Sequence, residues 1–198
     1  MYFEWDVVGL NIDRNYTLDR EEVQKLLNFL TVPPPAPKAP KAPKALPDRP
    51  SALLKLAVED MQKVLARPGY RFRGATWFQK DFKGGCTVCM AGAVMAGTLA
   101  VPAPAKPGEE LSPGSLADGR LEGPERKKLA ALERARSGRV LDYIQNGFPD
   151  LYAALTVDQA KAAAVATAII MPGYDRVGGR AGDGDYLAAA DVLEGVGL

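Results

Sequence analysis

The sequence predicts a mainly α protein: a small helical bundle preceded by an N-terminal extension and a proline-rich spacer. Apolar residues recur at helical spacing through most of 51–198. Eight of the 16 prolines fall within 33–50, in PPPAPKAPKAPKALPDRP, which predicts an extended polyproline spacer of about 3 Å per residue. No long stretch alternates as a half-buried strand would, although 7–12 could form a single strand.

The spacer divides the chain into three parts. Residues 1–32 form an anchoring segment with a short helix, 33–50 form the spacer, and 51–198 form the helical body. Five prolines and four glycines in 102–124 predict a surface loop within this body. The net charge is +1, but 1–32 carries three basic and six acidic side chains, 51–101 carries seven and three, and 140–198 carries three and eight. Blocks of opposite charge suit contacts with protein partners better than one large field.

Three helices are expected in the first two thirds of the body. The first begins at Ser51 and is stopped by Pro68-Gly69. The second, 86–101, is apolar on nearly every face and should be central. The third, 125–146, is amphipathic, and Gly147 follows it as a C-terminal cap. Within it, 126–128 (Arg-Lys-Lys) predicts one exposed turn.

Two further helices complete the predicted bundle. Thr156 and Gln159 have the spacing of a capping box, which opens an alanine-rich helix to Met171. Pro172-Gly173 should close that helix. The last helix is expected over 185–194.

The composition excludes several classes of protein. The chain has no histidine and only two cysteines, which excludes a Ser-His-Asp triad, a His-ligated zinc ion and a four-thiolate zinc site within one chain. The start of the sequence lacks the basic region of a secretory signal. The most apolar run, 86–101, is short for a bilayer span, so we expect no membrane contact. The sequence predicts neither an enzyme nor a cofactor.

Cys86 and Cys89 form a C-x-x-C motif at the start of a predicted helix. A helix N-terminus lowers the pKa of a thiol, and redox motifs use this effect. The segment that follows, MAGAVMAGTLA, has the composition of a buried core. Redox chemistry and buried packing therefore both remain open, and packing is the favoured interpretation.

The segment 11–22 resembles an EF-hand calcium loop in its spacing. Oxygen-bearing side chains occupy the ligand positions: Asn11, Asp13, Asn15, Thr17, Asp19 and Glu22. Tyr16, however, stands where the sharp turn needs glycine. The alternative is that Asp19 or Thr17 caps a helix that runs to Leu30.

The segment 173–185 combines glycines with two arginines and three carboxylates. Arg176, Arg180 and Asp183 are its candidate residues for binding a phosphorylated ligand, aided by backbone amides. The alternative is a solvated connection capped by Asp183. A direct nucleic-acid interface is not expected, because the basic residues lack an evident set of aromatic partners.

Aromatic residues lie between the first two body helices, and we expect Trp77, Phe78 and Phe82 to cover the open end of the bundle. The chain also contains the pattern W-x-Q, a short loop, then C-x-x-G-A, carried by Trp77, Gln79, Cys86, Cys89, Gly92 and Ala93. In this pattern it resembles, over about residues 52–100, a group of small uncharacterised phage and bacterial proteins. The group has no established activity, so the resemblance implies only a phage-encoded accessory protein.

Together these observations predict a non-enzymatic assembly or adaptor protein, plausibly a bacteriophage virion component in the head or tail. Its partners would be proteins of a larger assembly, and it would be located in the virion if phage-encoded and otherwise in the cytoplasm. The alternatives are a phage accessory protein that binds a small phosphorylated ligand or host factor, and a thiol redox protein that uses Cys86 and Cys89.

Overall fold

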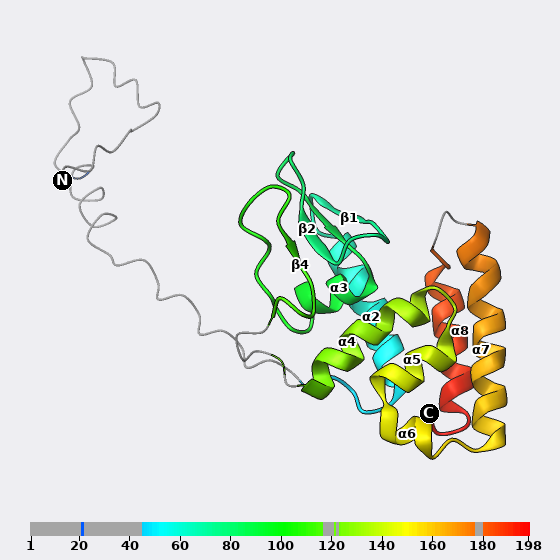
Figure 1. Ribbon diagram of the computed structural model, residues 1–198. Helices are drawn as coiled ribbons and strands as arrows, with labels where there is room; N and C mark the ends of the chain where they lie inside the picture. The colour runs from blue at the N-terminus through cyan, green and yellow to red at the C-terminus, as the bar shows by residue number, and fades with distance from the viewer. Residues whose placement is uncertain (1–20, 22–44, 117–120, 122, 177–179) are drawn as a thin grey trace. The chain divides into compact units, whose positions relative to one another are not determined.

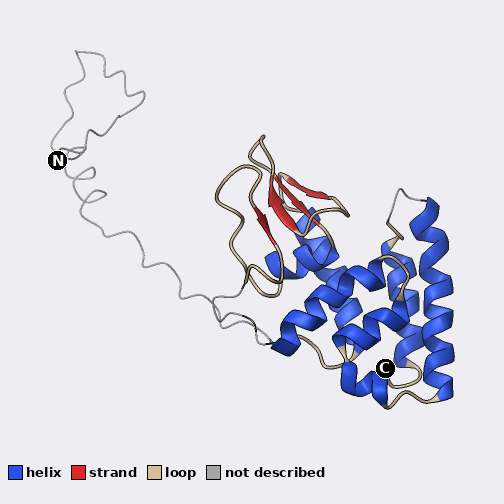
Figure 2. Cartoon of the chain, viewed as in Figure 1, coloured by secondary structure: helices blue, strands red, loops and turns tan. Residues whose placement is uncertain are grey.

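A computed structural model describes residues 21, 45–116, 121, 123–176 and 180–198. The chain divides into two compact units, Met1–Pro40 and Lys41–Leu198. Apart from Glu21, the first unit lies outside the described residues, and so does the strand predicted at 7–12. Helices dominate the second unit (Figure 2), which confirms the prediction of a mainly α fold.

Helix α2 (Pro50–Leu65) runs through the middle of the helical layer and packs against α3 (Met90–Ala96) and α8 (Asp183–Glu194) (Figure 1). Proline at its first position suits a helix start, because that N–H has no intrahelical partner. Its apolar stripe, which includes Leu53, Leu54 and Met61, is fully buried. The remaining helices are α4 (Gly123–Arg136), α5 (Val140–Gly147), α6 (Pro149–Ala153) and α7 (Val157–Arg176).

A small sheet, which the sequence did not predict, covers one end of α3. Its strands are β1 (Tyr70–Phe72), β2 (Phe78–Lys80), β3 (Cys86–Val88) and β4 (Glu110–Leu111), in the order β1-β3-β2-β4. β3 pairs parallel with β1 and antiparallel with β2, and β4 pairs antiparallel with β2. The helix predicted over 86–101 is therefore wrong at both ends. Its first three residues form a strand, because a continuous apolar run fits a buried strand as well as a buried helix, and the helix ends at Ala96.

Helix α3 packs directly on the backbone of β2. A Cβ atom at Gly92 would lie 1.6 Å from the carbonyl oxygen of Trp77, so only glycine permits this approach. Phe78 is fully buried beneath the same contact. Trp77 is half-buried, but Phe82 is 86% exposed, and the expectation that Phe82 covers the bundle is wrong.

The single helix predicted over 125–146 is two helices, α4 and α5. The chain turns between them at Gly138, whose φ of +75° favours glycine. The side chain of Met171 fills the space where a Cβ of Gly138 would lie. The break therefore brings the C-terminal end of α4 against α7.

The capping box of α7 is confirmed, whereas its predicted end is not. The N–H of Gln159 donates to Thr156 Oγ1 at 3.2 Å, and the N–H of Thr156 donates to Gln159 Oε1 at 3.0 Å. The helix continues through Pro172 to Arg176. Gly173 does not stop the helix. It is buried against Ala181, and because glycine has no side chain, the segment before α8 can approach α7 closely at this point.

Candidate functional site

A pocket of about 610 Å³ lies where the end of the predicted spacer meets the body. The segment before α2, the first turn of α4 and the junction of α5 with α6 form its walls. Its lining combines apolar and charged side chains: Asp48, Gly123, Pro124, Lys127, Lys128, Gly147, Phe148, Pro149, Asp150 and Leu151.

Leu46 fixes the end of the spacer against this pocket. Its side chain is only 3% exposed and belongs to the hydrophobic core. Its N–H donates to Glu125 Oε2 at 3.1 Å, and its carbonyl accepts from Lys128 Nζ at 3.5 Å. The last residues of the predicted spacer are therefore packed against α4 and belong to the compact unit Lys41–Leu198.

Lys128 is the most buried charge at this junction. Its side chain is 8% exposed, so the expectation of a fully exposed basic turn at 126–128 is wrong for this residue. Nζ lies 2.7 Å from Asp48 Oδ1, 3.5 Å from Glu125 Oε1 and 5.8 Å from the centre of the Phe148 ring. The hydrogen bond from Lys128 holds the pKa of Asp48 below its usual value. Lys128 thus holds Leu46 and Asp48, the residues that lead into α2, and its amino group is not free to act as a nucleophile.

The pocket can accept a short peptide or a small polar molecule. Its volume falls in the range typical of ligand sites. Lys127 and Asp150 are exposed at the pocket, while Phe148 offers a buried apolar surface. Because the charges are of both signs, the lining does not select strongly for an anion or a cation.

The two cysteines lie on a strand and at the start of a helix. Cys86 belongs to β3, and Cys89 is the N-cap of α3, where its Sγ accepts from the N–H of Gly92 at 3.4 Å. Both are buried free thiols. Burial, followed by the nearby Glu133 carboxylate, raises the pKa of Cys89 far above that of a free thiol. A protonated, enclosed thiol argues for packing and against the redox interpretation.

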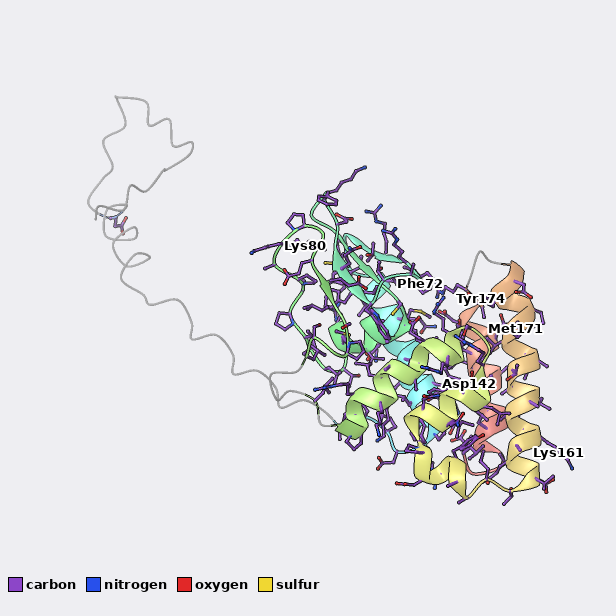
Figure 3. The ribbon with its side chains drawn as sticks, viewed as in Figure 1. Phe72, Lys80, Asp142, Lys161, Met171 and Tyr174 are labelled. Carbon is purple, nitrogen blue, oxygen red and sulfur yellow. The ribbon has the colours of Figure 1, made fainter. Side chains whose placement is uncertain are left out.

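The predicted phosphate-binding residues are brought only partly together. Arg180 pairs with Asp183 at 2.5 Å, and its guanidinium lies 4.8 Å from the centre of the Phe72 ring. Figure 3 shows Phe72 on the side of the sheet that faces α7. Arg180 thus joins β1 to the start of α8. The side chain of Arg176 lies outside the described residues.

The calcium interpretation concerns Asn11, Asp13, Asn15, Asp19 and Glu22, which all lie outside the described residues. In the described part of the chain, no group of three or more Cys, Asp or Glu side chains is arranged to hold a metal ion. None of the helices described there is long and apolar enough to cross a membrane.

Sequence reasoning missed an exposed finger, the loop 81–85 between β2 and β3. Asp81 fixes this loop, because its Oδ1 accepts from the N–H groups of Lys83 and Gly85, both at 2.8 Å. Its Oδ2 pairs with Arg71, which lowers the pKa of Asp81. The turn presents Phe82 to solvent. An aspartate followed closely by Gly84-Gly85 is a turn signal that could have revealed it.

Comparisons of the chain with protein-family models, with curated proteins and with solved structures found no match.

Proposed function

We propose that the chain is a non-enzymatic adaptor of a larger assembly and a component of a bacteriophage particle. In this proposal, residues 1–32 bind one protein partner and the body binds another. The spacer would join the two contacts and raise the effective concentration of the second once the first has formed.

The attachment of the spacer to the body is the observation that carries this proposal. A chain that merely preceded the body would need no fixed contact with it. Here Leu46 is seated in the core, and Glu125 and Lys128 hold its backbone. The described residues just before α2 therefore have a fixed position on the body, which suits an adaptor that joins two partners.

The test is to locate the chain in purified particles of the phage that encodes it, by peptide mapping with mass spectrometry. We expect stoichiometric copies of the chain in particles. A truncated chain that lacks 1–32 should still fold, but it should be absent from the particles assembled in its presence. A chain absent from particles but present in infected cells would contradict the proposal.

A second candidate function is the binding of a small phosphorylated ligand or a host factor in the junction pocket. Lys127 is the exposed cation of this pocket, whereas Lys128 is buried and paired with Asp48. Titration calorimetry with inorganic phosphate and with nucleotides tests this function. Binding that is lost in Lys127→Ala would support it, and no heat of binding would exclude these ligands.

A further inference from the structure

We infer that the body associates head to tail with a second copy of itself, the finger 81–85 of one copy docking on the outer face of α7 of the next. This inference rests on the proposed assembly function. It identifies a second copy of the chain as the partner of both surfaces, the finger and the outer face of α7.

The finger has the properties of an interface anchor. Phe82 is 86% exposed, on a loop whose backbone Asp81 holds at two points. Little ordering entropy remains to be lost when such a ring is buried. Large aromatic side chains at the centre of an interface carry much of its binding energy.

The finger is also basic. Lys80 and Lys83 flank Phe82, and Lys106 lies on the neighbouring loop, where Gly108 is in van der Waals reach of the Phe82 ring. None of these three lysines forms an ion pair with a described residue. The one acid of the finger, Asp81, is already engaged by Arg71, and the exposed Glu109 of the neighbouring loop accepts from the N–H of Lys106 at 2.9 Å. The finger therefore suits an apolar surface that is edged by carboxylates.

The outer face of α7 is such a surface. Two of its large apolar side chains are well exposed, Val157 at 71% and Val165 at 50%, and Met171, which packs against Gly138 on one side, is 36% exposed. They lie on one stripe of the helix, and Asp158 and Asp175 are exposed near its two ends. Among the described residues, Asp175 has no ion-pair partner, and Asp158 has only the exposed Lys161 at 3.5 Å. The whole segment 140–198 is acidic.

The two surfaces cannot meet within one chain. Figure 1 shows the sheet on one side of the body and most of α7 on the other, although the segment that follows α7 reaches β1 through Arg180 and Phe72. In Figure 3, Lys80 lies on the sheet side, whereas Lys161 points outward from α7. A contact between different faces of identical chains is heterologous, so it leads to a ring or an open filament.

Sedimentation velocity of the full chain, over a concentration series at low and at high salt, tests this inference. We expect reversible association that weakens with salt, because lysine–carboxylate attraction is screened. Phe82→Ser and Val165→Asp should each weaken association about tenfold or more. Tyr152→Ser removes another exposed apolar side chain, on α6, and should change nothing.

Mixing the two variants gives the decisive result. Phe82→Ser retains an intact α7 face, and Val165→Asp retains an intact finger. Their mixture should form a heterodimer that grows no further, while each variant alone stays monomeric. All substituted side chains are exposed, so thermal melting should match that of the wild type.

Three results would overturn the inference: a wild-type chain that is monomeric at every concentration, association that survives Phe82→Ser, or a mixture that does not associate. Loss of association in Val165→Asp alone would indicate symmetric pairing of two α7 helices instead. Failure of the adaptor proposal is separate, because it is read from the presence of the chain in particles and not from self-association.

Discussion

The seat of Leu46 predicts that two fragments cut ten residues apart will differ greatly in stability. Fragment 41–198 retains Leu46, whereas fragment 51–198 lacks both Leu46 and Pro50. Loss of a buried leucine side chain costs about 2–4 kcal/mol. The hydroxyl of the fully buried Tyr143 donates to the carbonyl of Pro50 at 2.8 Å, and leaving it without a partner costs a further ~1–3 kcal/mol.

The expected difference in the free energy of unfolding is therefore about 3–7 kcal/mol, comparable to the total stability of many domains. Urea unfolding followed by circular dichroism measures it. Leu46→Ala in the full chain should reproduce about half of the loss without a change in the slope of the transition. Equal midpoints for the two fragments would refute the idea that the end of the spacer is part of the core.

Gly92→Ala should unfold the body or lower its free energy of unfolding by at least ~4 kcal/mol, because the added Cβ would overlap the carbonyl oxygen of Trp77. Gly184→Ala, a control in open space on α8, should raise the free energy of unfolding by about 0.5–1 kcal/mol. Thermal melts of both variants measure these changes. Burial raises the pKa of Asp60, so the folded state binds this proton more tightly than the unfolded state does. As pH rises from about 4 toward neutral, the free energy of unfolding of the wild type should therefore fall relative to that of Asp60→Asn. Parallel pH profiles of the two proteins would contradict this. The double change of Cys86 and Cys89 to Ala should cost about 1–3 kcal/mol but leave particle incorporation intact, and a stable variant that fails to incorporate would reopen thiol chemistry.

The helices were predictable where local signals agree with packing. The start of α2 at Pro50, the apolar stripe behind it and the capping box at Thr156 each depend on residues within one or two turns. The mainly α fold follows from these local patterns.

The sheet and the helix breaks were not predictable in the same way, because contacts outside each element decide them. Strand β3 is held by β2 across the turn 81–85 and by β1 on its other side, and its three residues are too short for alternation to show. Gly138 and Gly173 were ambiguous for a similar reason: what each one does depends on the side chain or loop that fills the space beside it.

The candidate site was the least predictable feature. Lys128 looks in the sequence like part of an exposed basic turn, and only the fold brings Asp48 and the carbonyl of Leu46 to it. Phe82 looks like a core aromatic, yet the turn closed by Asp81 directs it outward.

The double hold on Leu46 has a mechanical consequence. A pull along the proline-rich segment would reach the body first at Leu46 and would be shared between α2, which follows it directly, and α4, whose Glu125 and Lys128 lie 79 and 82 residues further along the chain. The contacts of Leu46 would break first, because two hydrogen bonds to its backbone and the packing of its side chain would be lost together. Its release would lengthen the tether by a few residues while the helices stayed folded, so the junction would act as a small extensible coupling between the two ends of the chain.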